Sequence, residues 1–288
     1  TFTSHRAKGE EKSEFLASSD NWFRPTMTKT GPDGALYVAD MYRLVIEHPK
    51  WISPAMQSKL NLREGSDRGR IWRVFPKGAE LRTTPRLDRM TNKALVVALD
   101  SPSGWQRDTI QRLLLARGDK DASGALRKLA KTSKFPKVRL QALCILDGLD
   151  GLDSKVLKQA LEDPHPSVRE HVVRVCEGNH AELIASRLED ESIRVRRQVG
   201  FSLGEWKDPK AAEALVRLAL ADADNPRVQL AVKSSSLPHA ATMLKQIFSV
   251  QAKAPTGLLS DLIRFAILDD NLSPLAKVFD EIAADKNL

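Results

Sequence analysis

The sequence is poor in cysteine and in aromatic residues: its 288 positions include two cysteines, two tyrosines and 6% aromatic residues in total. Cys144 and Cys176 lie 32 positions apart, and spacing alone does not fix the Cβ geometry that a disulfide needs. A disulfide between them is one interpretation, but we favour two buried thiols that fill core positions. No C-x-x-C-H motif occurs, so no c-type haem is expected to attach within this chain.

Long hydrophobic runs and common catalytic motifs are also missing. The best apolar stretch, Ala94 to Leu99, is far shorter than the roughly 20 residues that a membrane-spanning helix needs. The sequence contains no G-x-S-x-G, Walker A, H-E-x-x-H or G-x-G-x-x-G pattern. It has no signal peptide and no initiator methionine, and Thr1 to Ser4 resemble the end of a β-strand. We therefore expect a fragment, from which the targeting of the parent cannot be read.

What the sequence does have is an ordinary globular composition with an excess of positive charge. Hydrophobic residues make up 42% and charged residues 28%, and the net charge is +8. Residues 1–90 hold 16 Lys/Arg against 11 Asp/Glu, and residues 91–288 hold 29 against 26, so the two parts carry +5 and +3. Acidic residues accompany nearly every basic run, which favours a solvated mixed surface over a nucleic-acid interface.

One short pattern occurs five times between Asp100 and Gln229: a turn, often with Asp or Pro, and then an apolar helix that opens in Val-Arg or a variant. The equivalent residues are spaced by 32, 30, 27 and 33 positions and are Arg107, Arg139, Arg169, Arg196 and Gln229. A period of this length is typical of stacked helix pairs. We predict a HEAT-type α-solenoid over 91–288, and a mainly α protein.

The helical periodicity places most elements of this solenoid. The expected helices are 92–99, 125–130, 138–146, 156–161, 168–175, 183–188, 195–203, 211–220 and 228–232. Positions that follow the repeat arginine are expected to line one continuous core, and they are Leu113, Leu143, Val172 and Val199.

The repeats also suggest a ladder of charges along the turn edge. Asp163 precedes Arg169 by six residues, and Asp190 precedes Arg196 by six. We expect Asp163 to cap the following helix and Arg169 to bridge to Asp190 of the next unit. The ladder is weaker at Asp100/Arg107 and Asp224/Gln229. As exposed pairs, these bridges are expected to contribute about 0–1 kcal/mol each and to weaken in salt.

The front of the chain has the strand signals instead. Candidate strands cover 26–30, 35–40 and 69–75, and Gly31-Pro32-Asp33-Gly34 between the first two predicts a type I turn. A short helix is expected near Pro54 to Leu60, inside an insertion that covers 45–67. Three strands cannot bury both faces of a sheet unaided. We therefore interpret 1–75 as the last blade of a truncated β-propeller, and 76–90 as a connector.

Several segments carry a resemblance to a known family, and they are 21–26 (NWFRPT), 31–43 (GPDGALYVADMYR), 67–74 (DRGRIWRV), 103–114 (SGWQRDTIQRLL) and 163–171 (DPHPSVREH). In this order they resemble large bacterial proteins classed as membrane-bound dehydrogenases or PVC-type haem-binding proteins. The resemblance is close from Phe15 to Val175, and beyond that it is to HEAT repeats in general. It implies a sugar-dehydrogenase-like propeller, then HEAT repeats, and commonly a c-type cytochrome domain. Most of the propeller and any haem domain would lie outside this chain.

The candidate binding residues lie near the end of the predicted inner hairpin. Arg24, Asp40, Arg43 and His48 could reach the mouth of a propeller, where propeller enzymes bind substrate or cofactor. We favour the alternative that Arg24 and Asp40 form a structural ion pair that closes the blade. The tryptophans Trp22, Trp51 and Trp72 are interpreted as blade packing and not as a stacking platform.

The six histidines are the first candidates for metal ligands. His165 and His171 are six residues apart, so on a helix they point in different directions, and neither is followed by another ligand type three or four residues later. We interpret them as solvated turn and helix residues.

Three functions remain open at this stage. The favoured one is a fragment of a propeller–HEAT–cytochrome redox protein, in which this piece supplies a blade and a docking solenoid without being catalytic. Its parent would be a dehydrogenase-like oxidoreductase, periplasmic or membrane-associated, with haem c in the missing part. Its partners would be another protein, or its own missing propeller and cytochrome domains. The alternatives are a HEAT interaction scaffold with no chemistry and a nucleic-acid-binding HEAT protein.

Overall fold

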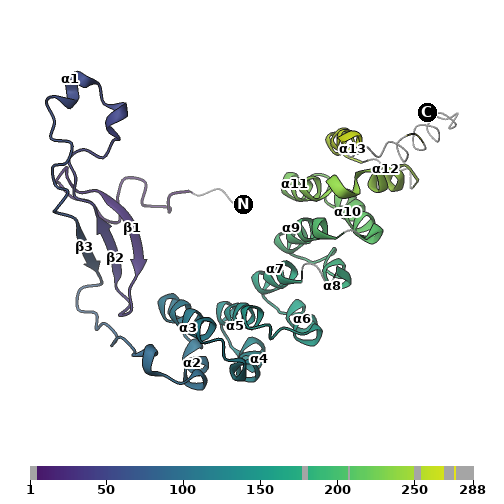
Figure 1. Cartoon of the computed structure of the whole chain (residues 1–288), viewed down its shortest axis with the longest axis horizontal. Helices are drawn as coiled ribbons and strands as arrows, with labels where there is room; N and C mark the ends of the chain where they lie inside the picture. Colours follow the sequence, from purple (N-terminus) through teal and green to yellow (C-terminus); the bar gives the residue numbers. More distant parts are fainter. Residues whose placement is uncertain (1–4, 177–180, 207, 250–253, 269–275, 277–288) are drawn as a thin grey trace. The chain divides into compact units, whose positions relative to one another are not determined.

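The structure is a computed structural model that describes residues 5–176, 181–206, 208–249, 254–268 and 276 (Figure 1). Its internal contacts divide the chain into two compact units. The first, here called the sheet unit, comprises 1–86 and 103–105, and the second, the solenoid unit, comprises 87–102 and 106–288. The division after Arg86 falls inside the segment interpreted as a connector.

The sheet unit is built on three antiparallel strands in the order β1-β2-β3. They are β1 (Pro25–Thr30), β2 (Leu36–Asp40) and β3 (Arg70–Val74). The tight link between β1 and β2 has the predicted turn, in which the amide of Gly34 donates to the carbonyl of Gly31 at 3.1 Å. Gly34 has φ of +90°, a backbone conformation that favours glycine. The predicted small sheet ahead of the helices is thus confirmed.

The two faces of this sheet differ in how far they are covered. Strand pairing sets Val38 opposite Trp72, on the face where Val38 is buried. On the other face Ala39 lies between Met27 and Ile71, which are both largely exposed, Ile71 to 70%. Because side chains alternate along a strand, one face is packed and the other presents apolar groups to solvent.

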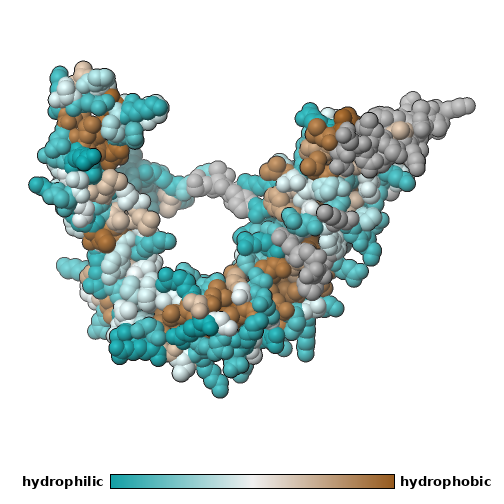
Figure 2. Space-filling model, viewed as in Figure 1, coloured by the Kyte–Doolittle hydropathy of each residue, from teal (hydrophilic) through white to brown (hydrophobic). Residues whose placement is uncertain are grey.

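A long loop joins β2 to β3. It contains the 3-10 helix η1 (Pro49–Trp51) and the single-turn helix α1 (Pro54–Gln57), which is shorter than the predicted 54–60. Gly65 has φ of +82°, and a Cβ there would lie 2.4 Å from the carbonyl oxygen of Tyr42, so only glycine fits. Figure 2 shows hydrophobic residues at the surface around this loop, where Trp51 is 79% exposed.

The solenoid unit follows after the 3-10 helix η2 (Leu87–Arg89). Its helices are α2 (Asn92–Leu99), α3 (Gly104–Arg117), α4 (Ser123–Thr132), α5 (Pro136–Gly148), α6 (Ser154–Leu161), α7 (Pro166–Val175), α8 (Ala181–Ala185), α9 (Ile193–Ser202), α10 (Pro209–Ala221), α11 (Pro226–Ser235), α12 (Ala240–Ser249) and α13 (Thr256–Leu268). Short 3-10 turns add η3 (Lys120–Ala122), η4 (Leu203–Glu205) and η5 (Leu237–His239).

These helices stack as pairs in two rows (Figure 1). In one row α5, α7, α9, α11 and α13 contact one another in succession. In the other row α2 contacts α4, α4 contacts α6, α8 contacts α10, and α10 contacts α12. The mainly α fold, a HEAT-type solenoid preceded by a small sheet, is as predicted. Among the predicted ranges α8 departs most clearly, because it ends at Ala185 where the pattern predicted a helix to Leu188, and α12 and α13 were not among the predicted helices.

The core of the solenoid repeats at fixed offsets from the repeat arginine or glutamine. The third residue after each repeat arginine or glutamine is fully buried, and these residues are Ile110, Ala142, Val172, Val199 and Val232. Seven residues after it stand another five buried ones: Leu114, Leu146, Cys176, Leu203 and Ser236. Of the predicted core residues, Leu143, Val172 and Val199 are buried in one cluster. Leu113 is only partly buried, and this prediction was wrong by one position, since the neighbouring Leu114 faces the core.

Proline begins many of these helices. It occupies the first position of α5, α7, α10 and α11, where its missing N–H has no helical partner to lose. Among the helices described, none combines the length and the hydrophobicity that a bilayer-spanning segment requires.

Candidate functional site

Asp40, the central candidate of the sheet unit, is a buried carboxylate whose two oxygens are both occupied. Oδ1 accepts from the backbone amides of Arg24 at 2.8 Å and Tyr42 at 2.9 Å. Oδ2 accepts from Nε of Arg70 at 2.9 Å and from the indole of Trp72 at 3.0 Å. Burial raises the pKa of Asp40, but these four donors outweigh it and lower the pKa to about 2. Asp40 therefore stays ionised and holds β2, β3 and the start of β1 together.

The other candidates do not converge on this carboxylate. The guanidinium of Arg24 donates to the carbonyls of Asn21 and Phe23. The guanidinium of Arg43 donates to the carbonyl of Leu62 at 2.9 Å. His48 is exposed, and its Nδ1 accepts from the amide of Lys50 at 3.2 Å, so the imidazole caps η1.

The predicted ion pair between Arg24 and Asp40 is therefore wrong in its partner. The salt bridge of Asp40 is with Arg70, and Arg24 reaches Asp40 only through its backbone amide. The side chain of Arg70 lies over the rings of Tyr42 and Trp72, at 3.8 and 4.8 Å from the ring centroids. Such a stack holds the guanidinium in place through a cation–π interaction.

The tryptophans divide into two kinds. Trp22 packs against Tyr42, with ring centroids 5.5 Å apart, and Trp72 contacts Phe23 at 6.5 Å. These two pack as predicted. Trp51 lies exposed with Lys50 over its ring at 6.0 Å, so the prediction of a packing role was wrong for this residue.

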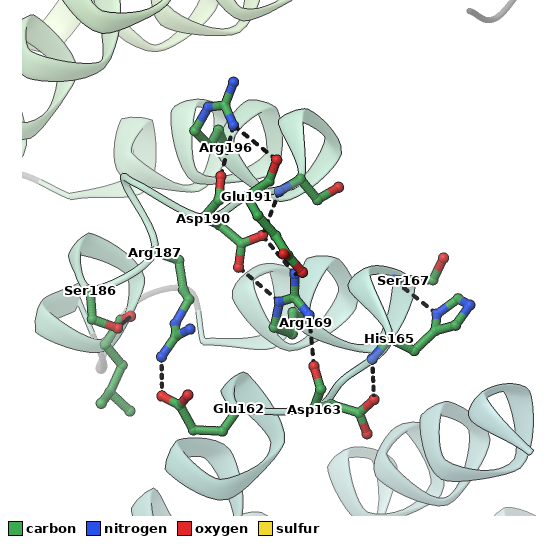
Figure 3. A network of polar contacts seen from close by, with 12 residues as sticks. Glu162, Asp163, His165, Ser167, Arg169, Ser186, Arg187, Asp190, Glu191 and Arg196 are labelled. Carbon is green, nitrogen blue, oxygen red and sulfur yellow. Dashed lines mark hydrogen bonds and ion pairs between the residues drawn. The ribbon is translucent and has the colours of Figure 1, made fainter. Parts of the chain in front are cut away.

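In the solenoid unit, the predicted charge ladder runs through consecutive repeats. Arg169 donates from Nη1 to the carbonyl of Asp163 at 2.7 Å, within its own repeat. It also donates from Nε and Nη2 to both carboxylate oxygens of Asp190 in the next repeat, each at 2.8 Å (Figure 3). Arg196 repeats the arrangement, with the carbonyl of Asp190 and the carboxylate of Asp222. The predicted bridge from Arg169 to Asp190 is confirmed.

This geometry explains the six-residue offset seen in the sequence. The residue six before the arginine contributes its backbone carbonyl to that arginine, and its carboxylate serves the arginine of the preceding repeat. Arg139 accordingly donates to the carbonyl of Ser133 at 2.9 Å. It also donates to both carboxylate oxygens of Asp163, at 2.7 Å each. Each ladder aspartate thus joins two repeats.

The ladder changes at its two ends. Because Ser133 replaces the aspartate, Arg107 has no such carboxylate to bind and donates instead to the amide oxygen of Gln141 at 3.0 Å. At the other end Gln229 replaces the arginine and donates to the carbonyl of Asp222 at 3.0 Å. Asp222 was missed in the sequence because it precedes Gln229 by seven residues and not by six.

The pairs Arg139–Asp163 and Arg169–Asp190 are also buried, and the pair Arg196–Asp222 is partly buried, which corrects the expectation of exposed pairs. Arg169 is 5% and Asp190 8% exposed. Burial raises the pKa of Asp190, but the bonds from Arg169 and from the amide of Ser192 lower it overall. The predicted cap was misplaced too: Asp163 accepts from the amide of His165 at 2.8 Å, and His165 itself caps α7.

Two further polar groups meet on neighbouring helices of the solenoid. Sγ of Cys144 on α5 lies 3.0 Å from Nε2 of His171 on α7. Burial raises the pKa of the Cys144 thiol and lowers that of His171, so a neutral thiol meets a neutral imidazole. Cys144 and Cys176 are both free thiols; Cys176 is buried as favoured, whereas Cys144 is only partly buried. His171 is therefore half-buried and bonded, whereas it was expected to be solvated. Within the described residues, no three His, Cys, Asp or Glu side chains gather as a metal site.

Comparisons with known proteins match two parts of the chain. Residues 1–78 match a family described as a domain of unknown function (DUF7133). Residues 154–173 and 181–198 match the family described as a HEAT repeat associated with sister chromatid cohesion. The second match covers α6 with most of α7, and α8 with part of α9, so the stacked helix pairs are HEAT-type repeats. No curated protein sequence matches the chain significantly.

Proposed function

We propose that this chain is a protein-docking scaffold in which the HEAT-type solenoid presents the binding surface. The observation that carries the proposal is the repeated core with its buried Arg–Asp ladder. Stacked repeats of this kind gain stability from their neighbours and display a long surface. The match of residues 154–198, in two parts, to HEAT repeats supports an interaction role.

The test is site-specific photo-crosslinking in cells, with a photoreactive residue at exposed positions of each helix row. Suitable positions are Lys128 and Arg217 in one row and Arg174 and Leu230 in the other. A crosslinked protein is then purified, and its Kd for the 288-residue chain is measured by calorimetry. We expect a saturable complex that charge reversal near the crosslinked position weakens. If the purified candidate does not bind, or binds equally after such reversals, the scaffold proposal is rejected.

We further propose that the parent is a propeller–HEAT–cytochrome redox protein, periplasmic or membrane-associated, with haem c outside this chain. The support is the similarity of residues 21–26, 31–43 and 67–74 to the closing blade of such proteins. The exposed apolar face around Ala39 agrees with a sheet that needs further strands or sheets beside it. In this proposal the sheet unit is one blade, and the solenoid docks the redox domains or another protein.

Reading the gene on both sides of the chain tests the redox proposal. We expect more blade-like segments upstream and a C-x-x-C-H motif in the parent, whose purified form should show a haem c spectrum. The isolated chain should show no Soret band and no reduction of an artificial acceptor by sugars. A parent with neither blades nor haem would exclude the redox proposal and leave the scaffold standing.

A further inference from the structure

The solenoid unit has a cavity that is lined by residues of α4, α5 and α6 and of the turn after α6. Its volume is about 410 Å³, within the range of about 300–1,000 Å³ that is common for ligand sites. The floor is aliphatic and is formed by Ala130, Leu143, Val156 and Ala160. Two of these residues are alanines, one on α4 and one on α6, and their small side chains take up little of the space.

The acidic groups around this cavity are already neutralised. Asp163 accepts from Nε and Nη2 of Arg139, at 2.7 Å each. Glu162 is bonded by the guanidinium of Arg187 from the next repeat (Figure 3). Neither carboxylate therefore needs a cation from a ligand, and neither repels an incoming anion with a full charge.

The basic groups that line the cavity are not all paired with carboxylates. Arg127 donates to the carbonyl of Gly151 at 2.8 Å and lies 3.5 Å from Asp153. Lys131 lines the cavity one turn further along α4, is exposed, and forms no ion pair within the described part of the chain. The cavity thus combines an aliphatic floor with an available ammonium group at its rim.

We propose that this cavity binds an extended segment of a protein partner that carries an aliphatic side chain next to a carboxylate. The aliphatic side chain would fill the space over Ala130 and Ala160, and the carboxylate would pair with Lys131. The proposal rests on the docking role proposed above and gives it a place and a chemistry. A nucleic acid fits less well, because the floor offers no aromatic side chain for a base and Lys131 is the cation without a described partner.

The probe is an acetylated, amidated hexapeptide of Gly and Ser that contains one Leu-Asp pair. Binding to the full ¹⁵N-labelled chain is followed by chemical shifts, and we expect saturable changes at the amides of Ala130, Lys131, Val156 and Ala160. Peptides with Leu-Asn or Ser-Asp in place of Leu-Asp should bind at least tenfold more weakly. A single-stranded oligonucleotide serves as the competing probe, and stronger binding of it at these amides would overturn the proposal.

The matched protein variants are Lys131→Glu and Lys128→Glu. Both reverse one charge on α4, but Lys128 does not line the cavity. We expect Lys131→Glu to weaken peptide binding at least tenfold, with an unchanged circular dichroism spectrum, and Lys128→Glu to leave it unchanged. Ala160→Leu, which fills the cavity, should also abolish binding.

Equal binding by the two lysine variants, or no saturable shifts at these amides, would overturn the cavity proposal. The scaffold proposal has a separate outcome. If a purified partner binds the chain and its Kd is unaffected by Lys131→Glu, the cavity proposal fails while the scaffold stands. If no partner binds at all, the scaffold itself fails.

Discussion

The two units of this chain bury carboxylates by different means. In the solenoid unit, each ladder aspartate meets an arginine from the preceding repeat, so that the bond joins two units of the array. In the sheet unit, the carboxylate of Asp40 accepts from two backbone amides, an indole and Arg70, all in or next to the same small sheet. Burying a charge is costly unless its partners are good. In the solenoid unit the partners of a buried carboxylate therefore connect neighbouring repeats. In the sheet unit they hold the strands of a single sheet together.

The largest difference between the units should appear when one ladder arginine is removed. Arg169→Ala leaves Asp190 buried without its bidentate partner, so we expect a loss of about 3–5 kcal/mol in unfolding free energy. Urea denaturation followed by circular dichroism measures it. The double variant Arg169→Met, Asp190→Leu should recover most of the loss, because it removes both charges together.

Arg174→Ala is the matched control for Arg169→Ala, since Arg174 is exposed on the same helix. It should change the unfolding free energy by no more than about 0.5 kcal/mol. Because the ladder pair is buried, added salt should alter the Arg169→Ala effect little. A loss below about 1 kcal/mol for Arg169→Ala would mean that the repeats do not depend on the ladder.

The second prediction separates shared core from surface within α3 and α5. Leu143 is buried in the continuous core, so Leu143→Ala should cost about 2–5 kcal/mol. Leu113 is only partly buried, and Leu113→Ala should cost less than half of that. Parallel urea titrations compare the two. Equal losses would place Leu113 in the core after all and shift the register by one residue.

The solenoid could be predicted from the sequence because one pattern is repeated. Asp163, Arg169 and Asp190 recur with fixed spacing, and their bridge follows from stacking. What the spacing could not show was which atoms bond: the six-residue offset reflects a backbone carbonyl, and Asp222 escaped notice because its turn is one residue longer. Burial of the pair was also missed, because it depends on the neighbouring repeats and not on local pattern.

In the sheet unit, the strands were predictable from alternation and turn residues, but the partner of Asp40 was not. Arg70 is 30 residues away along the chain, and only the pairing of β2 with β3 brings it beside Asp40. The residue types favoured Arg24, which follows two aromatic residues near the same strand end. Long-range pairing inside a single, unrepeated element therefore leaves no periodic signal in the sequence.

The third prediction uses acid to probe the sheet unit. The pKa of Asp40 is lowered from its usual 3.8 to about 2. A depressed carboxyl pKa gives stability that is present above the unfolded value and is lost as the pH falls towards the folded value. We expect about 2 kcal/mol of the sheet unit's stability to disappear between about pH 5 and pH 2 because of this group.

The control for the acid test is Asp40→Asn, which has no carboxyl to titrate. Hydrogen exchange of the β2 amides, measured by mass spectrometry, reports the local stability of the sheet in both proteins. The sheet of the wild type should be more stable than that of the variant at about pH 5, and this difference in local stability should disappear as the pH falls to about 2. A constant difference down to about pH 2 would show that Asp40 is not the titrating group.

The smallest effect is expected on the uncovered face of the sheet. Ile71 is 70% exposed, so Ile71→Thr should change the local unfolding free energy of the isolated chain by no more than about 0.5 kcal/mol. Val38 on the packed face is 2% exposed, and Val38→Ala should cost clearly more, about 1–3 kcal/mol, because it removes buried methyl groups. Hydrogen exchange at β2 and β3 compares the two variants.

Because an exposed apolar face promotes association, Ile71→Thr should also reduce self-association in sedimentation measurements at high concentration. If Ile71→Thr instead cost as much as Val38→Ala, the face around Ala39 would be covered in solution, and the contrast between a closed solenoid core and an open sheet would fall.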